Sequence, residues 1–91
     1  CLDGNQHICQ NLEFVGIDSP GALQERWNVP ASIAVPLPAG LGLRAAALVE
    51  PVAVAVHDVR RSELQVGDRV VVLGGGPIGL LIGTVAREAG A

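Results

Sequence analysis

The sequence predicts an α/β fold, and three observations along the chain support this prediction. Residues 21–38 show a β-like alternation, residues 44–61 are rich in Ala and Val at helical spacing, and residues 69–90 read as strand, glycine turn and helix. No repeat or low-complexity segment is visible. The changes of hydrophobic period therefore divide the chain into successive elements.

The first part of the chain predicts a loop followed by short edge strands. Residues 1–18 have neither the length nor the periodicity of a regular element, so we expect a loop or small lobe there. In residues 21–29 apolar and polar side chains fall on opposite parities, with Glu25 as the single exception. Prolines bound a second short run, residues 32–35, and prolines this frequent favour edge strands over a central sheet.

Residues 44–61 predict two helices. Because the residue before a proline is disfavoured in the α region, we expect the first helix to end near Val49 and the second to begin at Pro51. Arg60 and Arg61 fall in the last turn, where cations interact favourably with the helix dipole. The apolar stripe expected on one face of the second helix consists of Val52, Ala55, Val56 and Val59.

The last zone predicts a strand, a glycine turn and a helix. Residues 66–68 read as a turn, residues 69–73 as a buried β-branched strand, and residues 74–79 as G-x-G-x-x-G. Gly90 is placed to end the following helix with a left-handed cap. The apolar positions expected on that helix are Ile78, Leu81, Ile82, Val85 and Ala89.

The composition predicts a piece of a larger protein. Of the 91 residues, 49% are apolar and only 16% are charged, whereas soluble domains contain about 25% charged residues. A domain of this length buries only about 60 to 65% of the surface that its unfolded chain exposes. We therefore expect this apolar chain to come from the interior of a longer polypeptide.

Charge and hydropathy exclude two classes of partner. The net charge is −3, and the six Arg residues form no patch that could follow a nucleic acid backbone. The uncharged stretch 70–86 is slightly short for a membrane span, and its glycines and proline would break a helix in a bilayer. Two Cys do not make a disulfide scaffold, and the composition is compatible with a reducing compartment. We expect a cytoplasmic protein that binds neither nucleic acid nor membrane.

The G-x-G-x-x-G run is the candidate cofactor site. Gly74 would permit the tight turn, Gly76 would let the backbone approach a pyrophosphate, and Gly79 would allow close packing of helix on strand. Pro77 and Ile78 open the helix, whose N-terminal N–H groups suit phosphate. A glycine-rich turn that binds nothing is the alternative. The acidic group that would select NAD over NADP lies about 20 residues on, beyond Ala91.

Few other residues carry chemistry. Cys1 and Cys9 do not make a closed zinc site, and taken alone they read as two unrelated small residues. We assign His7 and His57 to structure. Glu50 lies among apolar residues near a helix end, where a carboxylate must be solvated, paired or coordinated.

With these residues in view, the whole chain resembles an internal stretch of the zinc-dependent medium-chain dehydrogenase/reductase family, in its polyol branch. Sorbitol, threonine and butanediol dehydrogenases are the nearest types, and the stretch would be roughly a quarter of a full-length member. The resemblance depends on ordered motifs: GNQHIC with its C-x7-C spacing, GALQERWNVP, AALVEPVAVAVHDVRR, VGDRVVVLGGGPIG and REAGA.

The resemblance implies two domains and two zinc sites. Residues 1–50 would end a GroES-like β-rich catalytic domain, and residues 51–91 would begin a Rossmann domain with its first βα unit. Cys1 and Cys9 would be the last two of four cysteine ligands of a structural zinc. Glu50 would face the catalytic zinc as a ligand or through its bound water.

The function implied by the resemblance is hydride transfer from a secondary alcohol or polyol to NAD or NADP. Zinc would lower the pKa of the bound alcohol. The remaining zinc ligands of the family precede Cys1, so we expect no activity from the 91 residues alone. A homodimer or homotetramer is expected for the longer protein.

Three alternatives stay open. A zinc-free quinone or enoyl reductase would share the glycine turn but lack the cysteine lobe. A flavoprotein would have the same turn near its chain start. A non-catalytic zinc or nucleotide-binding module would leave Glu50 without a role.

Overall fold

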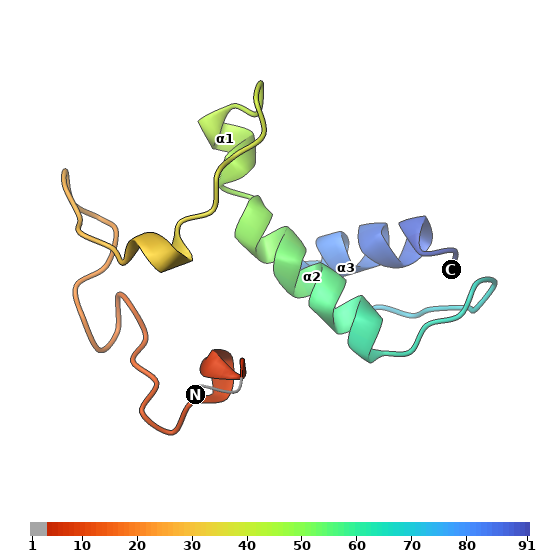
Figure 1. The fold of residues 1–91 in the computed structure, drawn as a ribbon. Helices are drawn as coiled ribbons and strands as arrows, with labels where there is room; N and C mark the ends of the chain where they lie inside the picture. The colour runs from red at the N-terminus through yellow and green to blue at the C-terminus, as the bar shows by residue number, and fades with distance from the viewer. Residues whose placement is uncertain (1–3) are drawn as a thin grey trace. The chain divides into compact units, whose positions relative to one another are not determined.

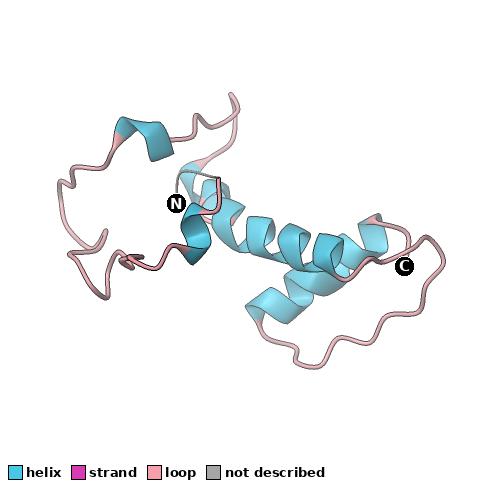
Figure 2. Ribbon diagram, turned by 60° about the horizontal axis from the view of Figure 1, so that its bottom comes forward, coloured by secondary structure: helices cyan, strands magenta, loops and turns pink. Residues whose placement is uncertain are grey.

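The computed structural model describes residues 4–91 and separates into two compact units, Cys1–Val35 and Pro36–Ala91. All regular elements of the described residues are helical, and no strand occurs among them (Figures 1 and 2). In chain order these elements are the 3-10 turns η1 (Gln6–Ile8) and η2 (Ala31–Ile33) and the helices α1 (Leu43–Ala46), α2 (Val49–Arg61) and α3 (Pro77–Glu88).

The first unit is built from tight turns. The backbone N–H of Phe14 donates to the carboxylate of Asp18 at 2.8 Å, and the N–H of Gly16 donates to the carbonyl of Ser19, also at 2.8 Å. An isolated bridge joins Val15 and Ser19. These local bonds take the place of regular structure, so the expected loop is confirmed for residues 4–18.

The prediction of edge strands between residues 21 and 38 is wrong for this structure. Residues 21–29 form no ladder, and η2 covers the first half of the run expected as a second strand. Pro30 is the N-cap of η2, where its fixed φ suits the entry to a turn. The alternating pattern indicates that the segment has an apolar and a polar face, but it does not supply a partner strand. An extended segment becomes a strand only when a neighbour accepts its hydrogen bonds.

The expected boundary between the two helices is also wrong by several residues. The first helix ends at Ala46 and the second begins at Val49, so Glu50 is helical although it precedes Pro51. Pro51 is the third residue of α2. The first N–H groups of a helix have no intrahelical acceptor, so proline loses no bond there, and its ring meets no helical carbonyl four residues back.

Helices α2 and α3 pack against each other in the second unit. Ala55 is fully buried and Val59 is nearly so, while Val52 and Val56 are half-buried, which confirms the stripe expected on α2. On α3 the expected Leu81, Ile82 and Val85 are half-buried. The expected Ile78 and Ala89, however, are exposed, and the side chain that α3 buries is Ala86, next to the expected stripe. Small residues at the contact let the two helices approach closely.

Residues 69–73 are extended but are not a strand in this structure, which corrects the expectation of a buried one. The segment makes no hydrogen-bonded ladder with any other described residue, because residues 4–91 place no second strand beside it. Its side chains are accordingly exposed, and Leu73 retains 94% of its accessible surface. The helical part of the α/β prediction is confirmed, whereas its β part is not observed among residues 4–91.

The turn at residues 65–68 joins the start of this extended segment to the end of α3. The N–H of Gly67 donates to the carbonyl of Gly90 at 2.7 Å, and the carboxylate of Asp68 accepts the N–H of Gln65 at 2.9 Å. Gly90 has φ +104°, so the expected left-handed end of α3 is confirmed.

Replacing Gly90 with Ala is expected to destabilise the second unit by about 1 kcal/mol or more. The positive φ disfavours any side chain, and an added Cβ would lie 3.0 Å from a methyl group of Val66. The measurement is the free energy of unfolding from urea denaturation followed by circular dichroism. Gly42→Ala is the control, because it has ordinary φ and an added Cβ there meets nothing within 4 Å. Equal stability of the two variants would contradict the prediction.

Glu63, just after α2, adopts a backbone conformation that favours glycine. Its φ is +57°, and it is the only described residue other than glycine with a positive φ. Glu63→Gly is therefore expected to stabilise the unit by about 0.5–1 kcal/mol, because the strain exceeds the entropy that glycine adds to the unfolded chain. Urea denaturation measures the gain, and Glu63→Ala should show none. A less stable glycine variant would refute this interpretation.

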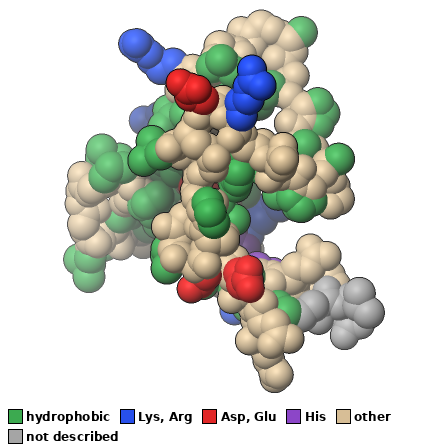
Figure 3. All heavy atoms as spheres, turned by 90° about the vertical axis from the view of Figure 1, so that its left-hand side faces the viewer, with side chains coloured by type: hydrophobic (Ala, Val, Ile, Leu, Met, Phe, Trp, Pro, Cys, Tyr) green, Lys and Arg blue, Asp and Glu red, His purple; other side chains and the backbone are tan. Residues whose placement is uncertain are grey.

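Most apolar side chains of the described residues are exposed. Only Ala55, Val59 and Ala86 are buried among residues 4–91. Figure 3 shows hydrophobic side chains on the surface of the face it presents. This exposure agrees with the scarcity of charged residues in the composition. None of the described helices is long and apolar enough to span a bilayer.

Candidate functional site

The glycine turn brings the extended segment into the N-terminus of α3. Gly74 has φ +115°, a conformation that a side chain would strain, and the chain bends on either side of it, at Leu73 and Gly76. Gly76 is the N-cap of α3 with ordinary extended geometry, φ −74° and ψ 178°, and Pro77 is the first helical residue. The glycine conformation expected at Gly74 and the first-turn proline are both observed.

At Gly79 the backbone of α3 lies close to the backbone of the glycine turn. A Cβ added at Gly79 would collide with the carbonyl oxygen of Gly74 and lie 3.1 Å from its carbonyl carbon. It would also lie 3.5 Å from a methyl group of Val72 on the extended segment. The close packing expected at Gly79 is therefore present, and it depends chiefly on the backbone of the turn rather than on side chains.

Gly76 faces open space. A Cβ added at Gly76 would meet no atom within 4 Å, so packing inside this chain does not require glycine there. No side chain caps α3, and the N–H groups of Ile78 and Gly79 lie in its first turn, where a helix provides no acceptor. Open space beside uncapped N–H groups and the positive end of a dipole suits a phosphate group. The geometry at these residues fits the pyrophosphate of a dinucleotide.

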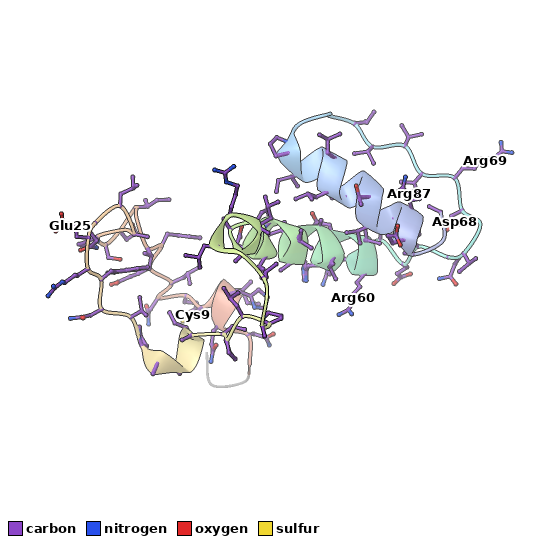
Figure 4. All side chains as sticks on the ribbon, turned by 90° about the horizontal axis from the view of Figure 1, so that it is seen from above. Cys9, Glu25, Arg60, Asp68, Arg69 and Arg87 are labelled. Atoms are coloured by element: carbon purple, nitrogen blue, oxygen red, sulfur yellow. The ribbon has the colours of Figure 1, made fainter. Side chains whose placement is uncertain are left out.

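A cavity of about 380 Å³ adjoins the turn, between the extended segment and one side of α3. The hydroxyl of Thr84 donates to the carbonyl of Leu80 at 2.8 Å, so its proton is already used within the helix. Figure 4 shows Arg87 on α3 with Asp68 and Arg69 on the loop beside it. The residues that line the cavity are Val72, Gly74, Gly75, Gly79, Leu80, Gly83, Thr84 and Arg87.

Sequence reasoning missed the polar members of this lining, Thr84 and Arg87. The only signal was their spacing: Leu80, Thr84 and Arg87 recur at four and three residues on α3, outside its expected apolar stripe. Arg87 lies 3.8 Å from the carboxylate of Glu88, and both side chains are 76% exposed. That ion pair is weak in water and leaves the guanidinium available.

Glu50 lies in the first turn of α2 and is exposed. Its carboxylate makes no hydrogen bond or ion pair with any described residue, which leaves both oxygens available. The positive end of the α2 dipole favours a negative charge at this place. Carboxylate oxygen is an accepted zinc ligand, so the donor at Glu50 fits the expected role.

The cysteine lobe is described only in part. Cys1 lies outside the described residues, and Cys9, at the end of η1, is half-buried and disulfide-bonded. Zinc ligation requires a thiolate, so a disulfide and a zinc site are alternative states of the same sulfur. No group of three or more candidate metal ligands comes together among residues 4–91. Zinc ligation by Cys1, Cys9 and Glu50 therefore stays a prediction.

Each of the two histidines lies in a helical element of the structure. His7 is in η1 and His57 is in α2, and both are exposed. His57 lines an apolar groove of about 530 Å³ along α1 and α2. Arg60, three residues further along α2, also lines it and projects from the end of α2 in Figure 4. Neither histidine lies in the glycine turn.

Curated relatives match the chain along its whole length. It is 57% identical to a 2-dehydro-3-deoxy-L-galactonate 5-dehydrogenase of Pseudoalteromonas atlantica. It is 40% identical to an L-threonine 3-dehydrogenase of Idiomarina loihiensis and 36% identical to an L-galactonate-5-dehydrogenase of Escherichia coli. Each alignment covers all 91 residues of this chain.

Along its whole length the chain is therefore similar to relatives that are named as galactonate and threonine dehydrogenases. The chain spans 26 to 27% of the length of the curated relatives named above. No protein-family model matches it, and no solved structure matches it. The family resemblance stated from the motifs is thus confirmed by relatives that are named as dehydrogenases.

Proposed function

We propose that this chain is the part of a dehydrogenase that binds the pyrophosphate of NAD or NADP and contributes one carboxylate to a catalytic zinc. The whole protein would oxidise a secondary alcohol of a small polyol or sugar acid. Relatives named as dehydrogenases of galactonates and threonine support the substrate class. The longer protein, rather than the 91 residues alone, would be the unit of activity.

The observation that carries the proposal is the contrast between Gly76 and Gly79. Gly79 has an evident packing reason to be glycine, because a Cβ would collide with the carbonyl oxygen of Gly74. Gly76 has none, since a Cβ would meet nothing and its φ is ordinary. A ligand that approaches the backbone at Gly76 supplies the missing reason.

The residues of the turn would act on the cofactor by binding and orienting it. The first-turn N–H groups of Ile78 and Gly79 would donate to phosphate oxygens, and the dipole of α3 would add favourable electrostatics. Pro77 keeps the first turn in place without an N–H of its own. When bound between these groups, the cofactor would supply a hydride acceptor for the oxidation of the alcohol.

Glu50 would bind the catalytic zinc directly or through its bound water. Its exposed carboxylate and its place at the start of α2 support this role. Cys1 and Cys9 would hold a structural zinc together with two cysteines supplied by the longer protein. A zinc ion held there would supply Lewis-acid chemistry to the reaction.

The domain boundary, the cellular compartment and the oligomeric state are also proposals. We place residues 1–50 at the end of a GroES-like domain and residues 51–91 at the start of a Rossmann domain. The extended segment, glycine turn and helix α3 support the second assignment. We propose that the longer protein is located in the cytoplasm and forms a homo-oligomer.

A hybrid enzyme tests the function. The 91 residues would replace the matching segment of the Pseudoalteromonas atlantica dehydrogenase, which aligns with the whole chain at 57% identity. We expect the hybrid to oxidise 2-dehydro-3-deoxy-L-galactonate with NAD or NADP and to contain zinc by elemental analysis. Circular dichroism and gel filtration establish that the hybrid is folded before activity is measured.

The outcomes separate the alternatives. A folded hybrid that binds neither NAD nor NADP would overturn the nucleotide site. Binding of FAD in place of the nicotinamide cofactor would favour the flavoprotein. Activity that survives complete removal of zinc by a chelator would favour the zinc-free reductase.

A further inference from the structure

We draw no further inference here: the strongest candidate, the apolar groove of about 530 Å³ that Leu41, Ala45, Leu48, Val52 and Val56 help to line along α1 and α2, is an unpartnered helix face, and nothing in the structure shows what covers it.

Discussion

Gly76→Val is expected to weaken NAD or NADP binding to the hybrid dehydrogenase by at least about tenfold, which corresponds to about 1.4 kcal/mol. The valine side chain would occupy the open space beside the N-terminus of α3, where the pyrophosphate is proposed to lie. The fold should be spared, because Gly76 has φ −74° and an added Cβ meets no atom within 4 Å. Calorimetric titration with each cofactor measures the dissociation constant.

Gly79→Ala is the matched control for that experiment. Its Cβ would collide with the carbonyl oxygen of Gly74, so we expect the variant to lose both cofactor binding and stability against urea. The two glycines belong to the same motif and lie three residues apart, so the comparison separates ligand approach from packing. An unchanged dissociation constant in Gly76→Val would remove the binding role from Gly76 and favour a glycine turn that binds nothing.

Glu50→Ala is expected to lower the turnover number of the hybrid by on the order of a hundredfold, the upper range for changes around a metal site. The variant removes the carboxylate proposed to face the catalytic zinc. The protein should still fold, because Glu50 is exposed and makes no hydrogen bond or ion pair with the described residues. Steady-state kinetics gives the turnover number, and elemental analysis gives the zinc bound per chain.

Glu88→Ala controls for the loss of one exposed carboxylate. Glu88 is 76% exposed and makes only the long contact to Arg87, so its removal should leave turnover within about twofold of the unmodified hybrid. Glu50→Asp tests the chemistry, because it keeps the carboxylate and should recover part of the lost activity. If Glu50→Ala turns over at the unmodified rate, Glu50 is a solvated surface residue and the metal role is refuted.

Elements that depend on near neighbours in the chain were predictable. The helical stripe of α2, the helix after the glycine turn and the left-handed end at Gly90 all follow from residues within one or two turns of each other. The turn at residues 66–68 belongs to the same class. The positive φ at Gly74 and the start of α3 at Pro77 were predictable too, because both depend on residue types within a few positions of each other.

Features that depend on distant partners were not predictable. The pattern of residues 69–73 is that of a buried strand, yet the segment is exposed because residues 4–91 contain no strand to pair with it. The polar lining at Thr84 and Arg87 depends on where the loop passes beside α3.

The left-handed Glu63 is a local feature that sequence reasoning also missed, since a charged residue carries no signal of positive φ.

The amino-acid sequence by itself determined the helices, the glycine turn, the candidate residues Glu50 and Gly74 to Gly79, and the family resemblance. These depend on hydrogen bonds and side-chain neighbours at short separation along the chain, where residue type and spacing are sufficient. Only the tertiary structure decided that Ala86 is the buried residue of α3, that Gly79 packs on a carbonyl, and that Gly76 faces open space. Those facts depend on the contact of α2 with α3 and on the direction of the turn, which spacing in a sequence does not specify.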